Sequence, residues 1–323
     1  MPERVLTNLD LERMVDTSDE WIRKRTGIER RHVVADGETT SDVAAQAARQ
    51  ALEHAGVAPG DVDWVVVSTD TPEMGNPATA CFVAGKIGAT RASALDFTGG
   101  CAGFLQSLCL LETRVKQAGE TILVVGAELL SRIVDWKDRA TCVLFGDGAG
   151  AAVLGPKPGG GGMVPAARFL SHYARTDGSM TDILAVPYGG TRYPKGDVRL
   201  TNGDLPAIVM HGQTVFRWAV ECMVDAAQTT VQRAGLKLSD IDLVIPHQAN
   251  VRIIDAVASR LKLPPERLFA DVAEYGNTGS ASIGIALVDA VRQGRIAEGA
   301  RVLLVAFGSG FTWSGSLMAF DGT

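Results

Sequence analysis

Short apolar runs alternate with longer amphipathic stretches over most of the chain. The runs are rich in Val, Leu, Ile and Ala, which predicts strands buried on both faces of a sheet at residues 63–68, 121–126, 141–145, 149–154, 242–245 and 301–306. Helical periodicity predicts helices at residues 40–55, 103–118, 214–234, 249–261 and 280–292. This alternation predicts an α/β fold in which helices cover a mainly parallel sheet.

The chain also contains an internal repeat. Residues 47–65 (AARQALEHAGVAPGDVDWV) match residues 226–244 (AAQTTVQRAGLKLSDIDLV) at 7 of 19 positions, with an offset of 179. The same offset carries Cys101 onto Ser280, and it carries Gly100 and Ala102 onto identical residues. We therefore predict two similar halves, with a chance likeness between two helix–turn–strand units as the alternative. A glycine-rich stretch at 155–162 separates an N-terminal half (1–154) from a C-terminal half (155–323).

Composition and charge narrow the class of protein. The net charge of -6 at pH 7 does not suit a nucleic-acid-binding protein, and no apolar run approaches the roughly 20 residues of a membrane-spanning helix. The start of the chain lacks the pattern of a secretion signal, so we expect a cytoplasmic protein whose five cysteines are free thiols. Because no two cysteines have CxxC spacing, we expect no metal site.

Cys101 differs from the other cysteines in its neighbours. In DFTGGCAGFL (96–105) an extended segment meets a glycine pair, then the thiol, then the predicted helix. Unpaired N–H groups at a helix N-terminus stabilise a thiolate, and small neighbours let a substrate carbonyl approach the backbone. This pattern predicts a nucleophile beside an oxyanion-binding turn. The alternative is a small residue at a tight crossover.

His247 and Asn277 are candidate partners for this thiol. His247 follows the strand predicted at 242–245, and catalytic groups collect at the carboxyl ends of parallel strands. By the repeat offset, Asn277 stands where Thr98 precedes Cys101. Taken alone, His247 is as typical of a helix cap as of catalysis, and Asn277 is more typical of a turn residue or an N-cap. Taken with Cys101, they predict a catalytic Cys–His–Asn set built from both halves.

Longer motifs extend this picture over nearly the whole chain. They are VDTSDEWIRKRTGIERRH (15–32), DFTGGCAGF (96–104), DRATCVLFGDGAGAAVL (138–154), VIPHQANVRII (244–254), YGNTGSAS (275–282) and AFGSGFTW (306–313). In this order they resemble the β-ketoacyl-acyl carrier protein synthase III family, the condensing enzymes that start type II fatty acid synthesis. The resemblance implies the thiolase fold, in which two duplicated halves form αβαβα layers.

The resemblance also implies a reaction. Cys101 takes the acyl group of a short acyl-CoA and releases CoA, after which malonyl-acyl carrier protein loses CO₂ and the resulting enolate attacks the acyl-cysteine. His247 and Asn277 stabilise the negative charge that develops, and the backbone N–H groups of Cys101 and Ser309 hold the other oxyanion. No metal or organic cofactor takes part.

Residues that bind substrates and partners follow from the same resemblance. The CoA and pantetheine site matches Thr17, Trp21, Arg25, Arg139, Gly212, Phe216 and Asn250, and the carrier-protein face matches Arg217, Arg252 and Arg260. Asn76 matches a position that closes the acyl pocket of the neighbouring subunit in a homodimer. For the basic residues, a solvated surface without a partner is the alternative. The family pattern includes a strand ahead of the segment that matches residues 2–5, so we expect the first sheet to have one strand fewer.

Other functions stay open from the sequence alone. A thiolase-fold enzyme of secondary metabolism would pass the acyl group to an oxygen or nitrogen acceptor. A papain-like thiol hydrolase uses Cys, His and Asn in the same order, but its local cysteine motif is absent and the internal repeat does not suit it. A non-catalytic carrier-binding protein is disfavoured by the Cys–His–Asn set. The run FGDGAG (145–150) lies between predicted strands with no helix after it, which disfavours a dinucleotide site.

Overall fold

The computed structural model describes residues 1–156, 166–187, 190–192 and 207–320, and most of the predicted linker at 155–162 lies outside them. The helices are α1 (Asn8–Glu12), α2 (Asp19–Thr26), α3 (Thr40–Ala55), α4 (Thr79–Ile87), α5 (Gly103–Ala118), α6 (Gly212–Arg233), α7 (Val251–Leu261), α8 (Val272–Tyr275) and α9 (Ser282–Arg292). The strands are β1 (Val5–Thr7), β2 (Arg30–His32), β3 (Trp64–Ser68), β4 (Ser93–Phe97), β5 (Ile122–Leu129), β6 (Asp147–Leu154), β7 (Arg168–Thr176), β8 (Leu184–Ala185), β9 (Val209–Met210), β10 (Leu243–Pro246), β11 (Arg301–Gly308) and β12 (Thr312–Ala319). Within the described residues, no helix combines the length and apolar character needed to cross a bilayer.

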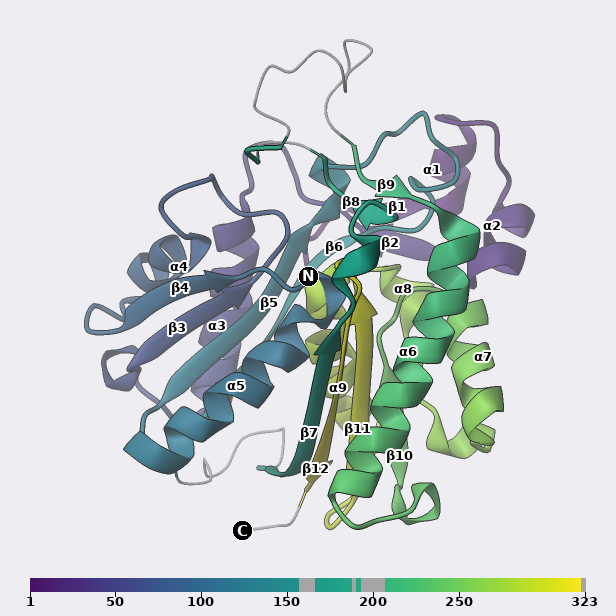
Figure 1. Ribbon diagram of the computed structural model, residues 1–323. Helices are drawn as coiled ribbons and strands as arrows, with labels where there is room; N and C mark the ends of the chain where they lie inside the picture. Colours follow the sequence, from purple (N-terminus) through teal and green to yellow (C-terminus); the bar gives the residue numbers. More distant parts are fainter. Residues whose placement is uncertain (157–165, 188–189, 193–206, 321–323) are drawn as a thin grey trace.

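Two four-stranded sheets form the framework of the molecule (Figure 1). The first has the strand order β4-β3-β5-β6, in which β3 is parallel to β4 and β5, and β6 is antiparallel to β5. The second has the order β10-β11-β12-β7, in which β10 and β11 are parallel and β12 is antiparallel to both of its neighbours. Two small hairpin-like pairs, β1-β2 and β8-β9, complete the sheet structure.

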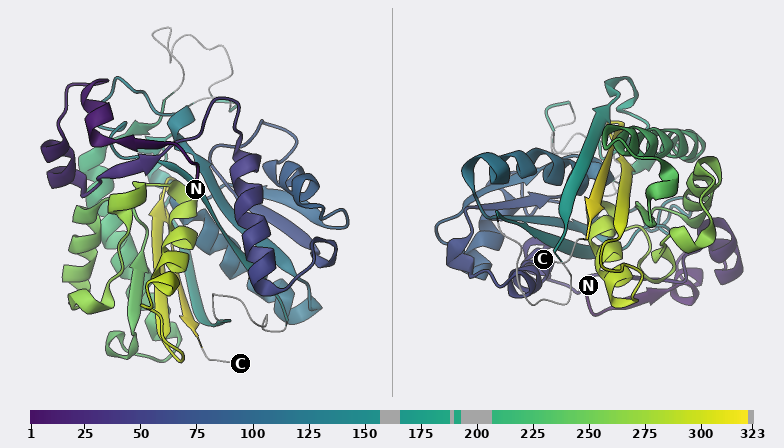
Figure 2. Two further views of the ribbon diagram at one scale, coloured as in Figure 1. Left: turned by 180° about the vertical axis from the view of Figure 1, so that it is seen from behind. Right: turned by 90° about the horizontal axis from the view of Figure 1, so that it is seen from below.

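Helices form three layers around these sheets, as Figures 1 and 2 show. In the middle layer, Phe104 of α5 and Ile283 of α9 pack with Val66 of the first sheet and Leu304 of the second. Helices α3 and α4 cover the outer face of the first sheet, and α6 and α7 cover the outer face of the second. Strands covered on both faces must be apolar on both faces, which explains the uninterrupted apolar runs. The αβαβα layering confirms the predicted fold class.

The internal repeat corresponds to repeated structure. The starts of α5 and α9 lie 179 residues apart (282 − 103), and so do the starts of β5 and β11 (301 − 122). A 3-10 turn precedes each of these two helices, η2 (Gly100–Ala102) and η8 (Gly279–Ala281), and the two turns begin with glycines at φ 57° and 56°. Side chains with a Cβ are disfavoured at such positive φ angles, so glycine permits the same turn in both halves.

The apolar run at 141–145 is not a strand, contrary to the prediction. The segment folds into turns in which the N–H groups of Thr141 and Cys142 donate to the Asp138 carbonyl at 3.1 and 3.0 Å. Val143 is buried in a core cluster with residues of β1 and α2, so burial and not sheet pairing explains the apolar pattern. At its end, Phe145 forms an isolated bridge with Asn277.

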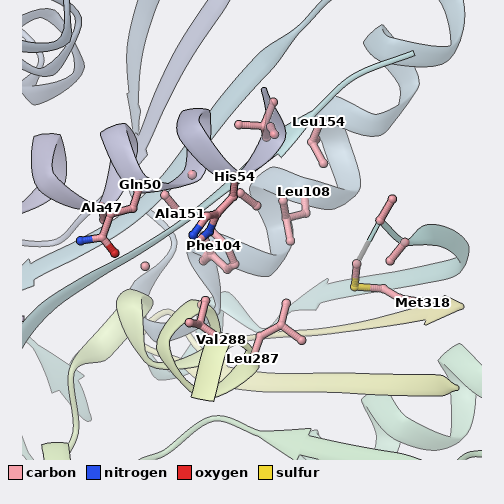
Figure 3. A pocket seen from close by; sticks show the side chains of 18 of the residues that line it. Ala47, Gln50, His54, Phe104, Leu108, Ala151, Leu154, Leu287, Val288 and Met318 are labelled. Carbon is pink, nitrogen blue, oxygen red and sulfur yellow. The ribbon is translucent and has the colours of Figure 1, made fainter. Parts of the chain in front are cut away.

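The outer edge of β6 borders a cavity of about 920 Å³, shown in Figure 3. Apolar side chains dominate its walls, among them Phe104 and Leu108 of α5 and Leu287 and Val288 of α9. Among the described strands, β6 pairs with β5 alone, whereas β12 in the second half pairs with both β11 and β7. Within the part of the chain that the structure describes, the first sheet therefore has an open edge where the second sheet has β7.

Candidate active site

A second cavity, of about 1070 Å³, lies where the two halves meet, next to the carboxyl ends of β3, β5, β10 and β11. The predicted site residues on its wall are Trp21, Arg25, Cys101, Arg139, Gly212, Phe216, His247, Asn250, Arg252, Asn277 and Ser309. Four predicted residues are not on this wall: Thr17, Asn76, Arg217 and Arg260. Groups that are far apart in the sequence thus share one cavity, because both halves direct their strand ends toward it.

Cys101 lies in the η2 turn at the N-terminus of α5, and its backbone packs against the end of β11. A Cβ placed on Gly308 would lie 2.5 Å from the Cys101 nitrogen, and one placed on Gly100 would lie 2.7 Å from the Ser309 nitrogen. These approaches are possible only for glycine, and they bring the Cys101 and Ser309 backbones side by side. The arrangement fits the predicted pair of backbone donors for an oxyanion.

The ionisation of Cys101 differs from the prediction. Burial raises the pKa of the thiol well above its usual value, and the carboxyl groups of Asp70 and Glu128 raise that pKa further. The expected stabilisation by N–H groups is therefore outweighed by desolvation and by neighbouring negative charge. Cys101 rests as a neutral thiol and must lose its proton as it attacks.

His247 lies directly after β10 and is 2% exposed. Its backbone N–H donates to the Val305 carbonyl at 2.7 Å, and its Nδ1 lies 2.6 Å from the Ser282 hydroxyl. Burial lowers the pKa of this imidazole to about 4, so the ring is neutral at physiological pH. If the Ser282 hydroxyl donates to Nδ1, the proton of the neutral ring resides on Nε2, which then acts as a donor.

Asn277 follows α8 and is held by its backbone on both sides. Its N–H donates to the Leu144 carbonyl at 2.8 Å, and its carbonyl accepts the Gly146 N–H at 2.9 Å. The side-chain Oδ1 accepts the Gly279 N–H at 2.9 Å, so the NH₂ group is the part of the amide that remains as a donor for a substrate. The turn at 141–145, wrongly predicted as a strand, thus positions this residue.

Trp21 lies near two guanidinium groups at the exposed rim of the cavity. The Arg25 guanidinium carbon is 5.3 Å from the indole centroid, and that of Arg139 is 5.0 Å from it. Arg139 also donates to the Asp16 carbonyl at 2.8 Å, which fixes its position. An indole face flanked by guanidinium groups suits a flat base that carries phosphates.

The remaining predicted residues divide into two groups. Asn250 caps α7, since its Oδ1 accepts the Arg252 N–H at 2.8 Å, and Phe216 lies 5.8 Å from the Arg252 guanidinium. Both residues line the cavity with Gly212, the first residue of α6. Arg217, Arg260 and Asn76 are exposed, and Thr17 is half-buried with no hydrogen-bond partner for its hydroxyl among the described residues. The geometry therefore supports the predicted roles of the residues on the cavity wall. It gives no comparable support for the four predicted residues that lie away from that wall.

Sequence reasoning missed two acidic residues and one hydroxyl at this site. Asp70 and Glu128 line the cavity beside Cys101, and Ser282 contacts His247 from the second half. The available signal was a carboxylate inside or directly after an apolar strand, as in the VVGAELL run that contains Glu128. Among the described residues, no group of three or more His, Cys, Asp or Glu side chains is arranged to hold a metal ion.

Comparisons with known proteins agree with this architecture. A family model described as 3-oxoacyl-[acyl-carrier-protein (ACP)] synthase III matches residues 95–178, and the model of the C-terminal part of that enzyme matches residues 231–320. A β-ketoacyl-[acyl-carrier-protein] synthase III from Caldanaerobacter subterraneus subsp. tengcongensis is 46% identical over 322 residues, covering 99% of this chain and 95% of that protein.

Solved structures give the same result. The synthase III from Thermus thermophilus superposes with a TM-score of 0.89 at 44% identity, covering 100% of this chain and 97% of that one. The priming β-ketosynthase of the R1128 polyketide pathway superposes with a TM-score of 0.86 at 35% identity, covering 99% and 93%. On these matches and on the duplicated αβαβα architecture, the chain belongs to the β-ketoacyl-[acyl-carrier-protein] synthase III family of condensing enzymes.

Proposed function

We propose that this chain condenses a short acyl-CoA with malonyl-acyl carrier protein, giving a 3-oxoacyl-acyl carrier protein, CoA and CO₂. The observation that carries the proposal is the meeting of Cys101, from the first half, with His247 and Asn277, from the second, on the wall of one cavity. Family membership supports the reaction class, and the geometry supports the division of labour among these residues.

In the first half-reaction, the Cys101 sulfur attacks the acyl-CoA carbonyl. The carbon–sulfur bond to Cys101 replaces the thioester bond of CoA, and the thiol proton is transferred to the departing CoA sulfur. The adjacent backbone N–H groups of Cys101 and Ser309 stabilise the oxyanion that forms between these events. Small neighbours at Gly100 and Gly308 keep this approach open.

In the second half-reaction, the malonyl thioester loses CO₂ and its enolate attacks the acyl-Cys101 carbonyl, releasing the thiolate of Cys101. The Nε2–H of neutral His247 and the NH₂ of Asn277 donate to the thioester oxygen, on which negative charge develops. A neutral imidazole stabilises this oxygen without offering the carbanion a readily transferred proton, and the depressed pKa of His247 keeps the ring in that form.

The substrate-binding residues are those that the family resemblance assigns, and most of those assigned to CoA line the cavity. The slot formed by Trp21, Arg25 and Arg139 takes the nucleotide part of CoA, and Thr17, Gly212, Phe216 and Asn250 contact the pantetheine. The acidic carrier protein docks on Arg217, Arg252 and Arg260, where complementary charge would speed association. We further propose a cytoplasmic homodimer in which Asn76 closes the partner's acyl pocket, and a reaction without cofactors.

Intact-mass measurement after incubation with acetyl-CoA tests the first step. Wild-type protein is expected to gain one acetyl group on Cys101, and Cys101→Ala is expected to gain none. His247→Ala and Asn277→Ala are expected to load acetyl but to release CO₂ from malonyl-carrier protein poorly. A label on another residue, or normal CO₂ release by both of these variants, would overturn the assignment.

A second candidate is acyl transfer in secondary metabolism; the likeness to a β-ketosynthase named for priming a polyketide pathway bears on the pathway and not on the acceptor. In that case acyl-Cys101 would form as before but would pass its acyl group to an oxygen or nitrogen acceptor. Product formation that requires malonyl-carrier protein distinguishes condensation from this alternative.

A further inference from the structure

Two carboxyl groups on the cavity wall have no role in the proposed chemistry. Asp70 follows β3, and Glu128 lies near the end of the neighbouring parallel strand β5, so the two side chains stand together beside Cys101. The Asp70 N–H donates to both carboxylate oxygens of Glu128, at 3.2 and 3.1 Å. Glu128 is 1% exposed, whereas Asp70 is partly exposed to the cavity.

The hydrogen-bond partners of Glu128 indicate which of the two carboxyl groups is protonated. The Ser280 hydroxyl contacts the Ser68 carbonyl at 2.8 Å and Glu128 Oε1 at 2.9 Å, but it has a single proton. A carbonyl can only accept, so when the Ser280 proton goes to Ser68, a proton on Oε1 removes the unfavourable oxygen–oxygen contact that would otherwise arise. The other oxygen, Oε2, accepts the Thr71 hydroxyl at 3.0 Å. Glu128 is therefore the neutral member, in line with burial, which raises its pKa to about 8.

The charge of the pair consequently resides on Asp70. Burial raises the pKa of both carboxyl groups, but Asp70 is partly exposed to the cavity and its carboxylate accepts a hydrogen bond from the Gly100 backbone, so Asp70 is the member of the pair that ionises. Among the described residues on this cavity wall, the basic side chains are Arg25, Arg139 and Arg252, and all three are exposed at the rim. The inner part of the cavity, next to the thiol that receives the acyl group, thus holds a negative charge that none of these basic side chains neutralises.

We propose that Asp70 is a specificity-determining residue that excludes negatively charged acyl groups from Cys101 and admits neutral ones. The proposal rests on the proposed function, since it concerns which acyl-CoA loads the cysteine. An acyl group on the Cys101 sulfur lies close to the Asp70 carboxylate, so a second carboxylate there is repelled. Two like charges about 6 Å apart at an effective dielectric constant of about 20 repel enough to slow loading on the order of 100-fold. Asp70 thereby keeps the malonyl group from loading onto the Cys101 sulfur in place of the neutral acyl group that starts the reaction.

Malonyl-CoA and 3-methylbutanoyl-CoA form a matched pair for the test, because a carboxylate and an isopropyl group have nearly the same shape. Intact-mass time courses give the rate of Cys101 loading for each, counting the malonyl adduct together with its acetyl decarboxylation product. Wild-type protein is expected to prefer the 3-methylbutanoyl group strongly. Asp70→Asn, which removes the charge at constant shape, is expected to reduce that preference on the order of 100-fold. Asp70→Ser provides the same comparison if the asparagine variant does not fold.

Glu128→Gln is the matched control, since it replaces a neutral carboxyl by a neutral amide that can still donate to Ser280. This variant is expected to keep the wild-type preference. The proposal is overturned if wild type loads both groups equally, if Asp70→Asn keeps the full preference, or if Glu128→Gln loses it. Absence of loading from every acyl-CoA would instead refute the proposed function itself.

Discussion

Acidification from pH 7.5 to pH 5.0 is expected to destabilise the protein through His247 in particular. The unfolded chain binds a proton at this imidazole below its ordinary pKa of 6.5, whereas burial in the folded protein lowers that pKa to about 4. Between these two values the unfolded state binds more protons than the folded state, so the free energy of unfolding falls as the pH falls. Below pH 4 both states are protonated and this dependence ends.

The magnitude follows from the shift in pKa. One pKa unit corresponds to about 1.4 kcal/mol, so the complete loss is about 3 kcal/mol, of which roughly 2 kcal/mol falls between pH 7.5 and 5.0. His247 is 2% exposed, so solvent screening does not reduce this value appreciably. Other buried groups, such as Glu128 and Asp271, have raised pKa values and act in the opposite direction. Their effect cancels when variants are compared at the same two pH values.

Urea denaturation at both pH values, with equal protein concentrations, provides the measurement. Wild type is expected to lose about 2 kcal/mol more than His247→Gln on acidification, because glutamine does not titrate. Asn277→Ala is the control: it alters the same cavity, retains the imidazole and should keep the wild-type pH dependence. Equal losses in wild type and His247→Gln would refute the reasoning, since the imidazole would then not be buried in its neutral form.

Two further substitutions test the geometry of the cavity. Gly308→Ala places a Cβ 2.5 Å from the Cys101 nitrogen, and the resulting shift of the turn is expected to slow acyl loading about 100-fold, as measured by intact mass; Gly60→Ala, where a Cβ meets nothing within 4 Å, should load normally. Trp21→Ala, which removes the ring beside Arg139, is expected to raise KM for acetyl-CoA about tenfold with little change in kcat. Acetyl-N-acetylcysteamine lacks the nucleotide, so an equal rise in KM for that thioester would contradict a nucleotide slot at Trp21.

Much of the framework was predictable because both of its signals are local. Buried strands such as β5 must be apolar on both faces, and the glycines at 100 and 279 are required by a positive φ. Apolar runs predicted the α/β class and the glycines predicted the turn that carries Cys101, whereas the repeat at an offset of 179 predicted the duplication. By contrast, β12 contains serines and a glycine whose small side chains pack inside the fold, and β7 is partly exposed and contains Arg168, His172 and Arg175, so an apolar-run criterion did not find either strand.

The errors at the site arise from contacts between distant segments. The run at 141–145 is apolar because it packs under β1 and α2, and periodicity alone does not distinguish such a buried turn from a strand. The ionisation of Cys101 was predicted from its own turn, whereas it is set largely by burial and by two distant residues, Asp70, which follows β3, and Glu128 of β5. These two acids contact each other across 58 residues of sequence, so only the folded chain reveals them as a pair.

The open edge of β6 makes the two lobes unequal in their resistance to local opening. Backbone amides of β6 that point away from β5 face a cavity, whereas β12 has a neighbouring strand on each side. Hydrogen–deuterium exchange should therefore be faster at every second residue of β6 than in β12, although the two strands hold equivalent places in a duplicated architecture. Local unfolding of the molecule would then begin in the half that carries Cys101.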